Sequence, residues 1–141
     1  MKIVNRKAQF NYQLIERIEA GIVLAGHEVR AVKNGHVDLA TAYAKIMGDE
    51  AYLINANIAS NISGDYSPTR ARKLLLHKNQ IISLQTKIQA KKLTLVPTKM
   101  YTKARLIKVE IALAKSKRKF EKKELKKKKD IEREIERELK G

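Results

Sequence analysis

The stretch from Pro68 to Lys78, P-T-R-A-R-K-L-L-L-H-K, carries the residues with the clearest chemical potential in the chain. Ser67 and Pro68 are a typical helix cap and first-turn proline, so we expect this stretch to open a helix. The helix dipole makes that end positive, so cations there cost stability unless an anion offsets them. Phosphate would do so, and we favour phosphate contact over a plain solvated face. The cations concerned are Arg70, Arg72, Lys73 and Lys78.

A second basic group lies near the N-terminus, in V-N-R-K-A-Q-F-N-Y. Asn5, Arg6 and Lys7 precede the first expected strand. On composition alone, a basic segment that faces RNA and a disordered cap explain these residues equally well.

Charge favours a polyanionic partner for the whole chain. Lys and Arg total 31 against 15 acidic residues, a formal net charge of +16 over 141 residues. Residues 115–141 hold 13 basic and 7 acidic residues, and residues 1–114 hold 18 and 8, so both parts are basic. Nucleic acid is favoured over an anionic membrane, because the chain has no long apolar run and no signal peptide. The tail also lacks the Trp, Phe and Leu content of membrane-surface helices.

No arrangement of residues typical of catalysis is visible. The chain has no P-loop, no Gly-x-Gly-x-x-Gly and no Gly-x-Ser-x-Gly. Glu19, Glu28, Asp38 and Glu50 could pair in space, but their spacing gives no reason to pair them. We therefore expect a protein that is not an enzyme.

Metal and thiol chemistry are also disfavoured. Cysteine is absent, which excludes disulfides and Cys-ligated zinc. None of the three histidines, His27, His36 and His77, has a second histidine at ligand spacing. We expect no metal site and no cofactor.

Alternating apolar residues predict strands over 37–47, 51–59, 93–101 and 105–114. Gly48 and Asp49 form a two-residue turn between the first two. The third contains Pro97, which indicates an edge strand or a bulge. The inward faces are expected to be Val37, Leu39, Thr41 and Tyr43; Tyr52, Ile54, Ala56 and Ile58; and Ile107, Val109, Ile111 and Leu113.

Helical spacing predicts two helices. Ala25, Val29 and Val32 share one face, and Asn34 with Gly35 ends that helix. The helix that opens at Pro68 would bury Leu74, Ile81, Leu84 and Ile88. Strands with short turns and two helices suggest a small barrel, closed or partly open, although periodicity alone does not separate a barrel from a sandwich.

Several motifs together resemble the bacterial SsrA-binding protein (small protein B) family. They are N-R-K-A (5–8), E-A-G-I (19–22), G-H-E-V-R-A-V (26–32), P-T-R-A-R-K-L-L-L-H-K (68–78), T-L-V-P (94–97) and K-V-E-I-A-L-A-K (108–115), followed by a basic tail. The resemblance implies a mainly β protein with flanking helices: a small antiparallel barrel like the oligonucleotide-binding (OB) fold over residues 1–114. Residues 115–141 would be a basic C-terminal tail, disordered or helical.

The resemblance also implies a function and partners. The expected protein binds the tRNA-like domain of transfer-messenger RNA and delivers it to stalled ribosomes for trans-translation. Its tail would act at 16S rRNA, in the decoding centre and mRNA channel. It would be monomeric when free, act in the bacterial cytoplasm and bind no membrane. A general tRNA- or rRNA-binding OB-fold factor remains the alternative.

The family's RNA-contacting positions fall on Asn5, Glu19 and Leu75, with the basic cluster beside them. A lone Glu in a basic protein is more often a salt-bridge partner, and Leu75 would by default be core. Three consecutive leucines on a helix cannot all face one way, so an exposed Leu75 is consistent with that helix. The full predicted RNA-binding set is Asn5, Arg6, Lys7, Glu19, Arg70, Arg72, Lys73, Leu75 and Lys78.

The tail departs from the family pattern A-K-G-K-K followed by D-K-R. Ser116 replaces the glycine, and Glu121 to Lys123 stand where Asp-Lys-Arg is usual. Charge signs are kept, but Lys cannot reproduce a bidentate Arg contact. Phe120 occupies the family's ring position and would stack on a ribosomal base. The predicted ribosome-contacting residues are Lys117, Arg118, Lys119, Phe120, Glu121, Lys122 and Lys123.

Overall fold

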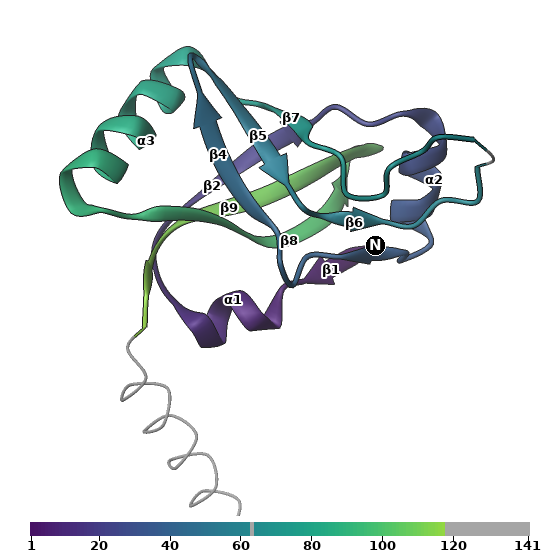
Figure 1. The fold of residues 1–141 in the computed structure, drawn as a ribbon, viewed down its shortest axis with the longest axis horizontal. Helices are drawn as coiled ribbons and strands as arrows, with labels where there is room; N and C mark the ends of the chain where they lie inside the picture. Colours follow the sequence, from purple (N-terminus) through teal and green to yellow (C-terminus); the bar gives the residue numbers. More distant parts are fainter. Residues whose placement is uncertain (63, 118–141) are drawn as a thin grey trace, which may run out of the picture.

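The structure is a computed structural model that describes residues 1–62 and 64–117. Strands dominate these residues, and three helices lie around them (Figure 1). The elements are β1 Lys2–Val4, α1 Arg6–Asn11, β2 Tyr12–Ile22, α2 Gly26–Lys33, β3 Val37–Asp38, β4 Tyr43–Met47, β5 Glu50–Ile54, β6 Asn57–Ile58, β7 Arg72–Leu75, α3 Lys78–Lys91, β8 Thr94–Lys103 and β9 Leu106–Ser116.

Six antiparallel strands close on themselves. The order is β1-β8-β4-β5-β7-β2-β9, and a further pairing of β8 with β9 completes the ring, with β1 attached outside β8. Two joints are thin: β4 meets β8 through Ala44 and Leu95, and β2 meets β7 through Gly21 with Leu75 and through one neighbouring pair. The predicted barrel-like fold is confirmed as a closed ring, less regular than a strict barrel.

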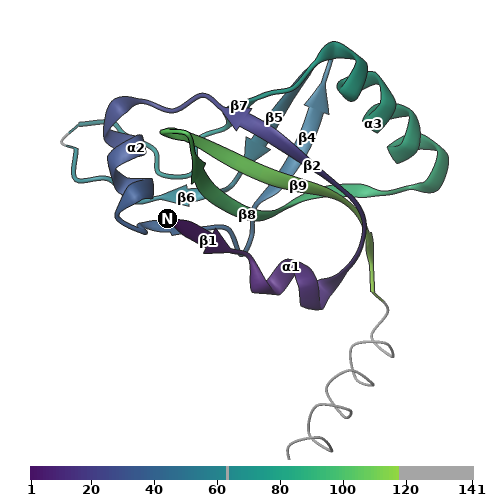
Figure 2. The same cartoon turned by 180° about the vertical axis from the view of Figure 1, so that it is seen from behind.

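Long ladders hold the rest of the ring. Seen from behind, β2 and β9 run side by side across the molecule (Figure 2). The predicted inward face of β9 is confirmed, because Ile107, Val109, Ile111 and Leu113 are all buried. They pack with Leu53, Leu74, Leu84, Leu95 and Met100 into one apolar core. Helices α2 and α3 cover opposite ends of the ring, and α1 lies on a third side (Figure 1).

The strands predicted over 37–47 and 51–59 are present, but part of each predicted face is wrong. A turn in which the Ala42 N–H donates to the Leu39 carbonyl, 3.0 Å, separates β3 from β4 and shifts the alternation. Ala44 is therefore buried and Tyr43 exposed. In β5 the buried residues are Ala51 and Leu53 instead of Tyr52 and Ile54. Asn55 follows β5 in the left-handed region, with φ 67°, and shifts the alternation of buried and exposed residues again. Ala56 and Ile58 are therefore buried, as predicted.

Turn and bulge predictions are confirmed. Met47 pairs with Glu50 across the two-residue turn, where Gly48 has φ 64°. The β8–β9 register shifts between Pro97 and Lys99, which is the bulge that proline predicted. Helix α2 ends at Lys33, as predicted, and Gly35 follows in the left-handed region.

The helix predicted from Pro68 is wrong in its first half. Residues 72–75 form β7, which pairs with β5 and β2, and α3 begins only at Lys78. The sequence R-K-L-L alternates between buried and exposed positions, and two neighbouring strands supply the backbone partners that a helix would have supplied itself. Within α3, Ile81 and Leu84 are buried as predicted.

Among the described residues, no helix is both long and apolar enough to span a membrane.

Candidate nucleic-acid interface

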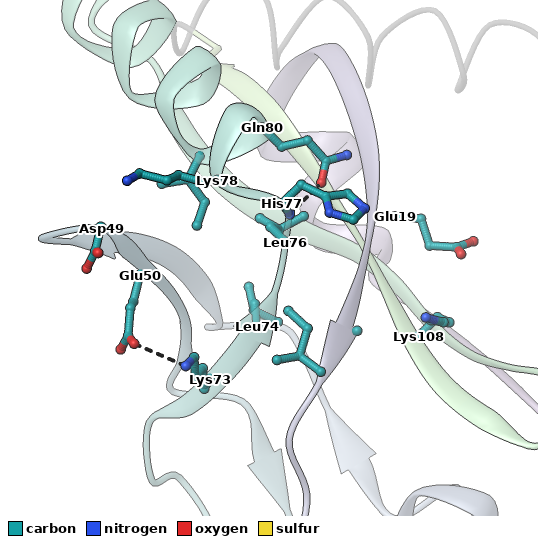
Figure 3. Close-up of a pocket in the computed structure, with 13 residues that line it drawn as sticks. Glu19, Asp49, Glu50, Lys73, Leu74, Leu76, His77, Lys78, Gln80 and Lys108 are labelled. Carbon is teal, nitrogen blue, oxygen red and sulfur yellow. Dashed lines mark hydrogen bonds and ion pairs between the residues drawn. The ribbon is translucent and has the colours of Figure 1, made fainter.

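An open hollow of about 620 Å³ lies where β7 leads into α3. It brings together four of the predicted RNA-binding residues, Glu19, Lys73, Leu75 and Lys78, from three separate elements. In Figure 3, Glu50 and Lys73 lie on one side of β7, and Glu19 and Lys108 lie on the other. The lining residues are Glu19, Gly21, Asp49, Glu50, Lys73 to Lys78, Gln80, Ile81 and Lys108.

Leu75 presents an apolar surface in this hollow. Its side chain is 53% exposed, whereas that of neighbouring Leu74 is 2% exposed. Successive residues of a strand point to opposite faces, so β7 buries one leucine and exposes the next. The expectation that a leucine faces outward is correct, but a strand produces it and not a helix. Gly21 lies directly beside it: a Cβ added there would come within 3.1 Å of the Leu75 Cβ.

Glu19 forms one wall of the hollow. Its carboxylate accepts a hydrogen bond from the Tyr101 hydroxyl and one from Lys103 Nζ at 3.4 Å. The hydrogen bond from Tyr101, and after it the hydrogen bond and charge of Lys103 and the charge of Lys108, lower the pKa of Glu19. Burial and the Glu19 carboxylate raise the pKa of Tyr101 to about 12. Glu19 is thus a salt-bridge partner, and it remains an ionised acceptor at the hollow.

Glu50 forms the opposite wall in the same way. Its carboxylate accepts from the Tyr52 hydroxyl at 2.5 Å and from Lys73 Nζ at 3.0 Å. The Tyr52 hydrogen bond and then Lys73 lower the pKa of Glu50. Sequence spacing gave no reason to join Glu50 to Glu19, because only the ring brings β2 and β5 to the two sides of β7.

Arg72 corrects the predicted basic cluster. Its side chain is fully buried, and its Nε and Nη2 lie 2.8 and 2.7 Å from Glu28 Oε2. Further donations reach the carbonyls of Ala56 and Pro68, both at 2.8 Å. This position does not support the predicted direct contact of Arg72 with phosphate, because its side chain is buried and its donor groups pair inside the protein.

Arg70 is drawn into the same buried group. Its Nη2 pairs with Glu28 Oε1, and its side chain is 39% exposed. Burial alone would raise the pKa of Glu28, but hydrogen bonds from Arg70, the Ala25 N–H and Arg72 bring it down to about 2. Tyr66 also donates to Glu28, at 3.1 Å. Through these contacts with Glu28, Tyr66 and Arg70 hold the segment before β7 against α2.

Asn5 also serves the fold. Its side chain is buried, accepts from the Ala8 N–H at the start of α1, and donates to the carbonyls of Leu39, 3.0 Å, and Pro97, 2.8 Å. This position does not support the predicted direct contact of its side chain with RNA. Arg6 and Lys7 follow it as the first residues of α1, with exposed side chains. Of the two alternatives for this segment, the ordered helix excludes the disordered cap.

Lys117 is the one predicted tail residue within the described part of the chain. Its backbone N–H donates to the Asn11 carbonyl and its Nζ to the Gln9 carbonyl, both at 3.0 Å. The strand β9 reaches Ser116, so the body extends slightly beyond the predicted boundary at residue 114. The other predicted tail contacts lie outside the described residues; they are Arg118, Lys119, Phe120, Glu121, Lys122 and Lys123.

Several lining residues were not predicted from the sequence to bind RNA, among them Lys108 and Glu50. The signal for Lys108 was present: it lies between Ile107 and Val109 in a strand whose inward face was predicted correctly. No cluster of His, Asp or Glu suited to a metal ion occurs in residues 1–62 and 64–117.

Known proteins resemble this chain along most of its length. The family model "SmpB protein" matches residues 2–141. The SsrA-binding protein of Persephonella marina is 46% identical, with 97% of this chain and 92% of that protein covered. The SsrA-binding protein of Malacoplasma penetrans is 45% identical over 86% of each chain.

A solved structure agrees with these sequence matches. A chain from "tmRNA-SmpB: a journey to the center of the bacterial ribosome" superimposes with a TM-score of 0.68 at 41% identity. The match covers 84% of this chain and 85% of that one. The motifs, the closed ring and the length of the matches lead to one conclusion: the chain belongs to the SmpB family of SsrA-binding proteins.

Proposed function

We propose that the chain binds the tRNA-like domain of transfer-messenger RNA and delivers it to stalled ribosomes in trans-translation. Family membership over residues 2–141 carries this proposal. The names of the relatives and the tmRNA–SmpB structure support it. The protein acts in the bacterial cytoplasm as an RNA-binding factor and not as an enzyme.

The hollow at β7 is the proposed RNA-binding site of the body. Leu75 offers an apolar contact to a base or sugar, and Glu19 offers a hydrogen-bond acceptor. Lys78 and Lys108 flank the hollow and can neutralise phosphates, as can Arg6 and Lys7 on α1. Folded RNA is recognised mainly by shape and backbone contacts of this kind, together with exposed loop bases.

The ribosome is the proposed second partner. Residues Lys117 to Lys123 and the basic sequence after them would meet 16S rRNA in the decoding centre and the mRNA channel. Lys117 itself contacts α1 through its backbone N–H and its Nζ. A general tRNA- or rRNA-binding OB-fold factor is the competing function.

A gel-shift competition distinguishes the two functions. Labelled transfer-messenger RNA is bound by the full chain and challenged with unlabelled transfer-messenger RNA or with bulk tRNA. The proposed function predicts that transfer-messenger RNA competes at concentrations at least roughly tenfold lower, a difference of about 1.4 kcal/mol. Equal competition by unrelated tRNA would establish the general factor instead.

A further inference from the structure

The hollow at β7 is not a basic patch, although it lies in a protein of net charge +16. Three carboxylates line it, and three lysines balance them. Its acids are Glu19, Asp49 and Glu50, and its lysines are Lys73, Lys78 and Lys108. A site built for phosphate alone would not place carboxylates on two walls, because like charges repel.

Each wall repeats the same arrangement of groups. A tyrosine hydroxyl and a lysine ammonium both donate to one glutamate: Tyr101 and Lys103 to Glu19, and Tyr52 and Lys73 to Glu50. These donors hold the carboxylate in one orientation and in its ionised form. An ionised carboxylate offers about four lone-pair sites, so about two remain on Glu50 after its two donors are satisfied. The side chain of Glu50 is 42% exposed, which leaves those sites accessible.

We propose that Glu50 is a second base-reading residue, which accepts hydrogen bonds from the N–H edge of an unpaired base as its counterpart Glu19 can. Guanine suits this acceptor best, since its N1–H and N2–H donors are adjacent and match the two oxygens of a carboxylate. Lys73 then acts as the partner that orients Glu50, and not as an independent phosphate contact. The inference rests on the proposed function, because it assumes that the hollow receives RNA.

The competing interpretation, that Glu50 merely pairs with Lys73, predicts the opposite change in RNA affinity when Glu50 is removed. If Glu50 only neutralises Lys73, its removal frees a cation and takes away a negative charge, so RNA should bind more tightly. If Glu50 accepts from a base edge, its removal should weaken binding. The conservative change Glu50→Gln separates the two, since an amide keeps the size but presents N–H₂ to the donors of the base.

Glu16→Gln is a matched control. Glu16 pairs with Lys87 at 2.7 Å, its side chain is also 42% exposed, and it does not line the hollow. Both variants remove one negative charge from one exposed ion pair. Binding of the full-length chain to the tRNA-like domain is measured by fluorescence anisotropy at fixed salt. Thermal melts confirm that both variants are folded, and Tyr52→Phe provides a second variant that keeps the carboxylate and releases its orientation.

We expect Glu50→Gln to weaken binding roughly tenfold, within the range for loss of one bidentate base contact. Tyr52→Phe should weaken binding less, and Glu16→Gln should leave it unchanged or slightly tighter. Kethoxal, which modifies N1 and N2 of unpaired guanines, gives an independent readout: wild-type protein should protect a guanine that Glu50→Gln leaves reactive.

Equal or tighter binding by Glu50→Gln, with the same protection pattern as the wild type, would overturn the inference and leave the proposed function intact. Equal weakening by Glu16→Gln would overturn it too, because a general charge effect would then explain both variants. A wild-type chain that does not bind the tRNA-like domain would instead refute the proposed function itself.

Discussion

At the scale of single residues, some charged side chains are buried within the fold and others are exposed at the proposed RNA-binding hollow. Arg72 and Lys73 are neighbours in the sequence, yet Arg72 is fully buried on Glu28 while Lys73 pairs with Glu50 at the hollow. Strand alternation separates them. A dense cluster of cations in a sequence therefore overstates the number of cations that can reach a phosphate.

Stability in acid should depend on Glu28. Its pKa in the folded protein is about 2, against an ordinary value of 4.5, so the carboxylate stabilises the fold fully above about pH 4.5. That stabilisation, about 3 kcal/mol, is lost as the pH falls toward 2. We expect Glu28→Gln to lower the free energy of unfolding at neutral pH by roughly 3–5 kcal/mol, since it leaves Arg72 buried without its charge partner.

Urea denaturation at several pH values measures both effects. The difference between wild type and Glu28→Gln should shrink steadily between pH 4.5 and 2. A difference that does not change with pH in this window would show that Glu28 does not carry the titration. Glu16→Gln, at an exposed pair, should change stability by no more than about 0.5 kcal/mol.

Truncation of Leu74 should affect stability, whereas truncation of Leu75 should affect RNA binding. Leu74→Ala removes core contacts, and we expect a loss of about 2–5 kcal/mol in stability. Leu75→Ala alters an exposed side chain and should change stability by less than about 1 kcal/mol while weakening RNA binding by roughly tenfold. Denaturation and anisotropy on the two variants check this. An unaltered RNA affinity in folded Leu75→Ala protein would remove Leu75 from the site.

At the scale of elements, local sequence patterns predicted most of the ring but not the site. β9, α2, the turn at Gly48 and the bulge at Pro97 follow from alternation, helical spacing and turn residues close together in the chain. β7 does not, because its conformation depends on partners in β5 and β2 that are distant in sequence. The cap at Ser67 and Pro68 is a local signal that these tertiary pairings override. Glu19 and Glu50 face one hollow for the same nonlocal reason.

The joint between β2 and β7 should depend on Gly21. Only two residue pairs make this joint, and a Cβ at position 21 would meet the Leu75 Cβ at 3.1 Å. We expect Gly21→Ala to displace Leu75 by a few tenths of an ångström, destabilise the fold by about 1–3 kcal/mol and weaken RNA binding.

The control for Gly21→Ala is Gly26→Ala, at the first residue of α2, where an added Cβ has open space around it. It should leave RNA affinity unchanged. If Gly21→Ala bound RNA as the wild type does, close packing of Gly21 on Leu75 would not be what shapes the hollow.

At the scale of the whole molecule, a basic body and a basic tail are proposed to have different partners. Their net charges of +10 and +6 are similar, so charge alone does not assign them. In the body, the proposed RNA-contacting residues Glu19, Glu50 and Leu75 lie on strands whose geometry the ring fixes. Family resemblance named the partners, and composition established only that a polyanion was to be expected.

Removing the tail should separate the two proposed activities. A chain that ends at Lys117 keeps the pairings of Lys115 and Ser116 with β2 and the contact of Lys117 with α1, which a chain ending at Ala114 would lose. We expect the chain ending at Lys117 to bind the tRNA-like domain within about twofold of wild type. It should fail to support trans-translation on stalled ribosomes. Severe loss of free-RNA affinity would contradict this division of labour.

The pairing of β2 with β9 determines when the ring can close. Ile18 pairs with Ile111, so most of the body must be synthesised before this ladder forms, and such distant contacts make folding slow. The β8–β9 hairpin is local and should form early, but its turn holds Ala104 and Arg105 at φ 50° and 67°, a conformation that suits Asn-Gly far better. Replacing the two by Asn-Gly should therefore raise the refolding rate more than it lowers the unfolding rate in stopped-flow experiments. A change confined to unfolding would mean that the hairpin forms late.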